Sequence, residues 1–271
     1  MTNHYFRRWF FSIVIACGLA ASYAAFSSAG GEDSPPDASS MTNLARNDPF
    51  AFLESCLKHY DRDVRGYALT MQKQERLQGR LQNKEVIEVA FKDRPHSVSL
   101  HWLQGVRKAD RVIYVAGEND GMMLAHPAGT AGMLVKVVRR KVDSEEARQS
   151  GRYTLDQFGF KNTLTRAIAS MQTAQKKGAL RLEFQGEAKV IEAGQRVCYK
   201  IKRTYSEPEA DGTQELTLYV DRENYLPIGV VVKGKVEPAS GNRELLGEYF
   251  FRNVRLNPEF KPDQFKEASF N

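Results

Sequence analysis

The stretch VIEVAFKDRPHSVSLHW (residues 86–102) alternates apolar and polar side chains on both sides of a short polar turn. The apolar members are Ile87, Val89 and Phe91 before the turn, and Val98, Leu100 and Trp102 after it. A period of two residues places each series on one face of an extended strand, and KDRP (92–95) provides the reversal. This pattern is typical of antiparallel strands with one buried and one wet face. We therefore predict a β-hairpin here.

The same period of two recurs along most of the chain and predicts a sheet of about ten antiparallel strands. Alternating series also occur at 67–71, 112–116, 122–126, 180–184, 197–201, 216–220, 228–232 and 245–251. A helical block over about 143–178 separates the earlier strands from the later ones. Because short polar turns join consecutive strands, we expect one meander before this block and a second after it.

Helical spacing is found at the start of the folded region and in the central block. DPFAFLESCLKHYD (48–61) has an apolar stripe behind Asp48 as N-cap and Pro49 at the first helical position. Asp143 with Glu146, and Thr154 with Gln157, fit the starts of two short helices. A longer helix follows and ends near Gly178; its apolar face consists of Leu164, Ile168 and Met171.

These elements predict an α+β fold with a strongly curved antiparallel sheet. It would be a half-barrel of about ten strands, with helices packed on its concave face. Residues 48–271 are long enough to bury one core and are expected to form this single domain. Residues 30–47, rich in Ser, Gly, Asp and Pro, are predicted to be a flexible linker.

Residues 1–29 have the pattern of a signal peptide or an N-terminal anchor. Arg7 and Arg8 precede an uncharged apolar run over 9–26, and small residues follow it. Cleavage, lipidation of Cys17 in the lipobox-like VIAC, and retention as an anchor all remain open. We expect an exported protein of the periplasm or cell envelope, membrane-associated if the N-terminus is uncleaved or lipidated.

The formal net charge of +6 is dispersed along the chain, so the charge pattern argues against a nucleic acid partner. Cys56 and Cys198 remain after signal cleavage, and the sequence leaves open whether they pair or stay buried thiols. No Cys/His spacing fits a zinc site, and we expect neither a metal nor another cofactor.

The segment YVAGENDGMMLAHPAG (114–129) collects acidic, amide and histidine side chains between glycines. Asp120-Gly121 suits a tight reversal between two strands, and the spacing lacks the ligand pattern of a calcium loop. We interpret the segment as a hairpin. A lone His126 before Pro127 is expected to be a surface or hydrogen-bonded residue rather than a catalytic base.

No nucleophile elbow, zinc-protease motif, phosphate loop or dinucleotide fingerprint occurs, and we predict a non-catalytic protein. One face of the predicted sheet is rich in aromatic and methionine side chains, which suits an adaptable apolar surface. The candidate groove residues on this face are Trp102, Tyr114, Met122, Leu124, Phe184 and Tyr199. They would be ordinary core beneath the helices, or would leave open a groove for an acyl chain.

Four stretches resemble an exported bacterial family of unknown function, numbered 1571. They are KQERLQGRLQNKEVIEVAFKDRPHSVSLHWLQG (73–105), RVIYVAGENDGMMLAH (111–126), RYTLDQFGFKNTLTRAI (152–168) and LGEYFFRNVRLNPEFKPDQF (246–265). This resemblance implies an exported protein but no activity, because the family has none assigned.

A more distant resemblance is to the periplasmic lipoprotein-carrier (LolA/LolB-like) superfamily. It lies in YALTMQKQER (67–76), in YVDRENYLPIGVVV (219–232), above all Asp221 through Pro227, and in the last strand before LNPEF (256–260). This resemblance implies a curved half-barrel, plugged by helices, that holds acyl chains.

We therefore predict an exported binding protein for a lipid or a lipoprotein acyl chain. Two alternatives remain: a sensor or scaffold that binds envelope proteins, and a hydrolase in which His126 acts with Asp120 or Glu118.

Overall fold

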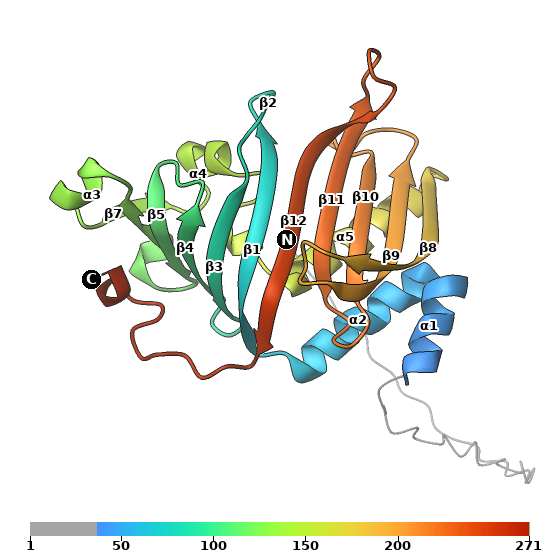
Figure 1. The fold of residues 1–271 in the computed structure, drawn as a ribbon, viewed down its shortest axis with the longest axis horizontal. Coiled ribbons are helices and arrows are strands. Elements are labelled where there is room, and N and C mark those ends of the chain that lie inside the picture. The colour runs from blue at the N-terminus through green and yellow to red at the C-terminus, as the bar shows by residue number, and fades with distance from the viewer. Residues whose placement is uncertain (1–36, 271) are drawn as a thin grey trace, which may run out of the picture. The chain divides into compact units, whose positions relative to one another are not determined.

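The computed structural model describes residues 37–270, which belong to one compact unit. The predicted signal segment and Cys17 lie outside the described residues. An antiparallel sheet of twelve strands dominates the fold (Figure 1). Its strands are β1 (Gly66–Leu77), β2 (Arg80–Leu81), β3 (Glu85–Lys92), β4 (Ser97–Gln104), β5 (Ala109–Val115), β6 (Met122–Pro127), β7 (Val138–Lys141), β8 (Leu180–Val190), β9 (Arg196–Tyr205), β10 (Glu215–Asp221), β11 (Pro227–Val236) and β12 (Arg243–Leu256). The prediction of about ten strands did not include β2 and β7, which are too short to show alternation.

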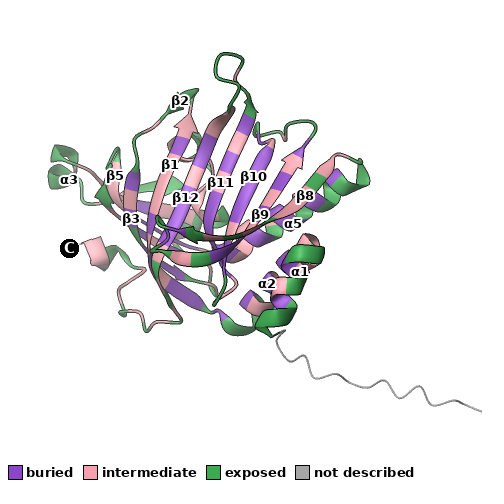
Figure 2. Cartoon of the chain, turned by 45° about the vertical axis from the view of Figure 1, so that its right-hand side comes forward, coloured by how far each residue is buried: buried purple, intermediate pink, exposed green. Residues whose placement is uncertain are grey.

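The sheet consists of two meanders that meet at its centre. The strand order is β7-β6-β5-β4-β3-β1-β12-β11-β10-β9-β8, and β2 pairs with β1. The first and last long strands are therefore neighbours, with Met71 opposite Phe251. This pairing joins the two meanders into one continuous, open and curved sheet. Along its strands, buried residues alternate with more exposed ones (Figure 2). The predicted α+β fold, two meanders of a curved antiparallel sheet with helices, is confirmed.

Helices α2 (Pro49–Asp63) and α5 (Phe160–Lys176) are the two long helices of the described residues. The Asp48 side chain caps α2 by accepting a hydrogen bond from the Ala51 amide at 2.9 Å, as the sequence predicted. Helix α2 packs against α5, and α5 packs against strands β8 and β11. The predicted apolar stripes face inward; their buried members include Phe52, Cys56, Tyr60, Leu164, Ile168 and Met171. The two helices therefore supply one wall of the core.

The second half of the predicted flexible linker is a helix. Helix α1 (Ala38–Asn47) starts at Asp37, whose side chain accepts a hydrogen bond from the Ser40 amide at 2.7 Å. Met41 and Ala45, four residues apart, are buried in the main core. The linker prediction is therefore wrong for residues 38–47, because a short polar helix with one small apolar stripe resembles a tether in composition.

The central block is less helical than predicted. Helix α4 (Glu145–Ser150) is capped by the hydroxyl of Ser144 and not by Asp143. Thr154 precedes a single 3₁₀ turn, η2 (Leu155–Gln157), and its side chain makes no capping hydrogen bond. Another short helix, α3 (Thr130–Leu134), and a 3₁₀ turn, η1 (Asn119–Gly121), lie between β5 and β7.

The C-terminal segment after β12 crosses the outer face of the sheet and ends in a 3₁₀ turn, η3 (Glu267–Phe270) (Figure 1). Phe265 and Phe270 pack against a small cluster formed by Ile113, Val115 and Leu124. The C-terminal segment therefore covers part of the outer face of β5 and β6. Within residues 37–270, no helix is both long and apolar enough to span a membrane.

Candidate ligand-binding cavity

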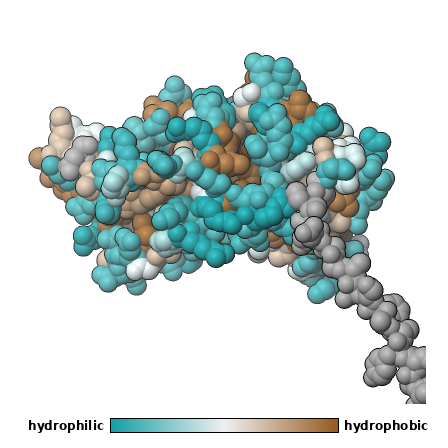
Figure 3. All heavy atoms as spheres, turned by 90° about the horizontal axis from the view of Figure 1, so that it is seen from below, coloured by the Kyte–Doolittle hydropathy of each residue, from teal (hydrophilic) through white to brown (hydrophobic). Residues whose placement is uncertain are grey.

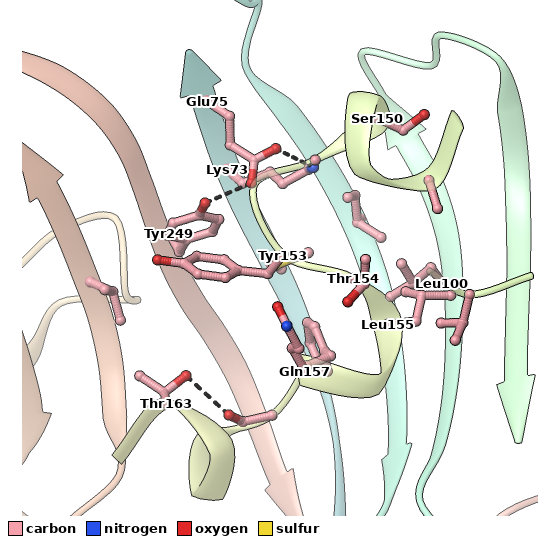
Figure 4. A pocket seen from close by; sticks show the side chains of 18 of the residues that line it. Lys73, Glu75, Leu100, Ser150, Tyr153, Thr154, Leu155, Gln157, Thr163 and Tyr249 are labelled. Atoms are coloured by element: carbon pink, nitrogen blue, oxygen red, sulfur yellow. Dashed lines mark hydrogen bonds and ion pairs between the residues drawn. The ribbon is translucent and has the colours of Figure 1, made fainter. Parts of the chain in front are cut away.

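A cavity of about 990 Å³ lies between the sheet and the segment that contains α4, η2 and α5 (Figure 4). Cavities of about 300–1,000 Å³ are typical of small-molecule sites. The sheet forms one wall, and residues 146–173 form the other. The helical block therefore stands off the sheet here instead of filling its face.

The wall formed by the sheet is a row of apolar side chains that cross-strand pairing aligns. Residue pairs in register run from β1 to β7; they are Met71 with Ile87, Ile87 with Trp102, Leu100 with Val112, Val112 with Ala125, and Ala125 with Val138. All of these residues line the cavity. Paired residues in an antiparallel sheet point to the same side, so the row is a consequence of register.

The opposite wall comes from the turns before α5 and from its first half. Tyr153, Leu155 and Phe158 face the sheet across the cavity, and Thr163 and Ala167 of α5 continue this wall. In Figure 4, Tyr153 lies below Tyr249, and Leu155 lies beside Leu100. Aromatic and aliphatic groups therefore line both walls.

A buried polar cluster closes one end of the cavity. Glu75 accepts hydrogen bonds from the Tyr249 hydroxyl at 2.6 Å and from the Lys73 ammonium at 2.9 Å (Figure 4). The ammonium also lies 3.7 Å from Glu85, which accepts a 2.6 Å hydrogen bond from the Trp102 indole. Both carboxylates are almost fully buried. The Lys73 ammonium is thus a cationic partner for both carboxylates.

The pKa values reflect this pairing. Burial alone raises the pKa of Glu75, but the Lys73 charge and the hydrogen bonds from Tyr249 and Lys73 outweigh it, so the net pKa is below the ordinary value. Burial, together with the Glu75 charge, holds the Tyr249 pKa well above the ordinary value. At neutral pH Glu75 is therefore a carboxylate and Tyr249 a neutral donor.

Two arginines lie on the side of the cavity formed by α5. The Arg166 guanidinium stacks over the Tyr153 ring at 4.5 Å and donates to the Gln157 carbonyl at 2.7 Å. Arg203, only 3% exposed, donates to the Glu209 carboxylate at 2.5 Å and also to the Ser170 hydroxyl. The cavity therefore offers long apolar walls together with fixed positive groups, an environment that suits an amphiphile.

The model of the family described as "Protein of unknown function (DUF1571)" matches residues 64–271. The chain belongs to the DUF1571 family. The family resemblance predicted from the sequence is confirmed. The match begins after α1 and α2, so it covers the whole sheet and the helical block. No curated protein matches this DUF1571 chain significantly.

Several solved structures are similar to this DUF1571 protein. MucB has 16% sequence identity and a TM-score of 0.46, over 80% of this chain and 62% of MucB. The chain thus covers less than two thirds of MucB. A LolA superfamily protein from Nitrosomonas europaea has 8% identity and a TM-score of 0.35, over 80% and 98% of the two chains. The lipoprotein LppX of Mycobacterium tuberculosis has 11% identity and a TM-score of 0.36, over 79% and 98%.

Six groove residues were predicted from the sequence of this DUF1571 protein, and one of them, Trp102, lines the cavity. Tyr199 is fully buried beneath the N-terminal helices, where its ring contacts Phe52 at 5.1 Å and its hydroxyl hydrogen bonds to Thr42 at 2.9 Å. Phe184 lies beside Tyr199, with 6.3 Å between ring centres. The structure therefore places Phe184 and Tyr199 in the packed core and away from the cavity.

The remaining three lie near the outer half of the first meander. Tyr114 is buried near His96, 6.1 Å from its ring, and is not part of the cavity wall. Leu124 points to the outer face, into the cluster covered by the C-terminal segment. Met122 has the same parity as Leu124, whereas Met123 lines the cavity. Met123, Ala125 and Pro127 are thus the cavity residues of β6.

The 114–129 segment is a hairpin in this DUF1571 protein, as predicted. Asp120 and Gly121 have positive φ angles of 54° and 72° in the turn between β5 and β6. His126 makes a 2.7 Å hydrogen bond with Asp110 through Nδ1, and not with Asp120 or Glu118. The hydrolase alternative, in which His126 would act with Asp120 or Glu118, therefore lacks that contact, because the strand register places His126 beside β5 and not beside the turn.

Cys56 and Cys198 are buried free thiols. Burial raises the pKa of Cys198 to about 12 and that of Cys56 well above its ordinary value, so both are neutral thiols at pH 7. Over residues 37–270, no cluster of three or more His, Cys, Asp or Glu side chains is arranged to hold a metal ion.

Proposed function

We propose that this protein is an exported, non-catalytic binding protein of the cell envelope that holds an acyl chain of a lipid or lipoprotein in its cavity. The cavity of about 990 Å³, with apolar walls, is the observation that carries this proposal. Each buried methylene contributes about 0.8 kcal/mol, so one acyl chain would be retained reversibly.

The polar groups of the cavity support an amphiphilic ligand. Glu75 and Glu85 are occupied by partners of their own, whereas Arg166 is held by one carbonyl and the face of Tyr153. A guanidinium with free N–H groups would donate hydrogen bonds to a phosphate or carboxylate headgroup. The acyl chain would then extend along the apolar row toward Ala125 and Val138.

The buried carboxylates also support binding over catalysis. A general base needs a free lone pair directed at its substrate. The Glu75 carboxylate instead accepts hydrogen bonds from Lys73, Tyr249 and the Arg152 amide. The cluster would therefore keep the end of the cavity in shape. Export is supported by the signal-like residues 1–29.

The first test is a native mass spectrum of protein purified from a bacterial periplasm without detergent, before and after organic extraction. We expect an added mass that extraction removes, and saturable binding of a fluorescent fatty acid by the extracted protein. A bare polypeptide mass without uptake of the probe would overturn the proposal and favour a protein-binding scaffold.

A matched pair of variants locates the ligand. Ala125→Trp places an indole in the cavity, whereas His101→Trp places the same ring on the outer face of β4. Excluding about two methylenes should weaken binding of the probe about tenfold in Ala125→Trp. His101→Trp should bind like the wild type. Equal affinity in both variants would mean that the ligand binds elsewhere.

A further inference from the structure

The segment that follows β6 and includes α3 and β7, residues 129–142, has an exposed apolar tip. Leu134 is 87% exposed and Met133 is 85% exposed, the highest values among the large apolar side chains that the structure describes. Val135, next in sequence, is 47% exposed. Three consecutive exposed apolar residues form a patch, which single exposed residues do not.

The tip is held on the sheet by close packing. Gly132 of α3 lies so near β6 that an added Cβ would clash with the Pro127 carbonyl and lie 2.8 Å from the His126 ring. Any larger residue there would displace the helix. Met133 and Leu134 therefore project from a short helix that rests directly on a strand, at one end of the sheet (Figure 1).

The charged residues within the tip segment are all positive. Residues 129–142 contain Lys136, Arg139, Arg140 and Lys141 and no Asp or Glu; acidic residues resume at Asp143. All four cations are exposed. Arg139 has an exposed partner, Glu267, at 3.6 Å, and within residues 37–270 no carboxylate pairs with the other three. In Figure 3, atoms of hydrophobic residues are exposed at the end of the compact unit at which Figure 1 shows α3.

An exposed apolar tip in a segment whose charged residues are all cationic matches the chemistry of an anionic bilayer surface. Apolar side chains enter the boundary between headgroups and acyl chains, while Lys and Arg are attracted to anionic headgroups. We propose that residues 129–142, the docking tip, insert Met133 and Leu134 into an anionic phospholipid membrane.

The docking tip lies at the edge of the cavity. Val138, Arg140 and Val142 belong to the tip segment and line the cavity, as do Ala125 and Pro127 of the preceding strand. A docked protein would therefore present this edge of the cavity to the bilayer. Exchange of a lipid between membrane and cavity rests on the proposed function, whereas membrane docking does not.

The test uses the full chain with an environment-sensitive fluorophore on Met133→Cys. We expect a blue shift with vesicles containing phosphatidylglycerol and a much smaller one with pure phosphatidylcholine, since the cations select anionic lipid. The same label on Ser240→Cys, in the exposed loop before β12, should not shift. Signal from the native cysteines is subtracted with the labelled wild type. No shift at position 133, or equal shifts at both positions, would overturn the proposal.

A second variant separates docking from ligand binding. The double variant Met133→Ser/Leu134→Ser should bind anionic vesicles about tenfold or more weakly than the protein with Met133 and Leu134 in place. Vesicle binding is measured in both proteins from the fluorescence of a label on Val135→Cys. The affinity of the double variant for the fluorescent fatty acid should equal that of the wild type, because neither residue lines the cavity. If the wild-type protein does not bind the fatty acid, the proposed acyl-chain function is refuted but membrane docking is not. If the double variant binds vesicles as well as the wild type does, the docking proposal is refuted but the acyl-chain function is not.

Discussion

Glu75 is the residue on which the polar end of the cavity depends. It is 4% exposed and joins Lys73 of the same strand to Tyr249 of β12 and to the backbone before Tyr153. Three elements therefore meet at one carboxylate. Removing one partner from such a cluster leaves the others buried and incompletely paired, which costs more than the cluster itself contributes.

Glu75→Gln should destabilise the fold by about 3 kcal/mol at neutral pH, because Lys73 loses its nearest buried counter-charge. The effect depends on pH. Since the folded-state pKa of Glu75 is lowered, its contribution is present above the unfolded pKa of about 4.3 and is lost as the pH falls through the folded value. Thermal unfolding by circular dichroism from neutral to acidic pH should show the two proteins converging in acid.

The control is Glu88→Gln, which removes an exposed glutamate whose partner His101 is also exposed. This substitution should change stability by about 0.5 kcal/mol or less. If Glu75→Gln unfolds at the wild-type temperature at neutral pH, the buried cluster does not stabilise the fold.

Met123 and Leu124 show what a sequence pattern can and cannot decide about single residues. The run MMLA (122–125) has four apolar residues in succession, so alternation does not select a face. The face depends on the turn, whose 3₁₀ geometry sets Val112 opposite Ala125. A shift of one residue moves every side chain to the other side. The run VIYV (112–115) could have predicted the burial of β5, because a continuous apolar run indicates a strand that is covered on both faces.

Among the elements, long ones with strong periodicity were predictable and short ones were not. The Asp48 cap of α2, the glycine after α5 and the apolar stripes of both helices appear directly in the sequence. Helix α1 has one buried pair, Met41 and Ala45, and owes its stability to the surface on which it docks. The separation between η2 and the sheet, which creates the cavity, depends on tertiary packing and leaves no local pattern.

Helix α1 should contribute measurably to stability although the family match begins after it. Met41→Ala truncates a side chain that is only 1% exposed. It should lower the free energy of unfolding by about 2–3 kcal/mol, because the truncation leaves a cavity between the docked helix and the core. Asn43→Ala, on the exposed face of the same helix, is the control and should change stability little. Urea unfolding compares the two variants. Equal midpoints would show that α1 does not pack on the core in solution.

At the scale of the whole compact unit, the cavity belongs to no single meander. Its lining includes Met71 and Leu100 from the first half, Val230 and Phe251 from the second, and the helical block between them. The pairing of β1 with β12 joins the halves, so the sheet behaves as one layer. A ligand in the cavity would therefore contact both meanders and the helical block between them.

This arrangement predicts that an acyl ligand stabilises the compact unit as a whole. At a free concentration 100 times its Kd, a ligand bound only to the folded state adds about 2.7 kcal/mol. For a protein of this size each kcal/mol raises Tm by about 2–4 °C, so scanning calorimetry of the extracted protein with added fatty acid should show a rise of about 5–10 °C. The transition should stay single, because the ligand links both meanders. Ala125→Trp should show a much smaller rise at the same concentration. A split transition, with one part unaffected by ligand, would mean that the halves of the sheet unfold separately and that the ligand touches one of them.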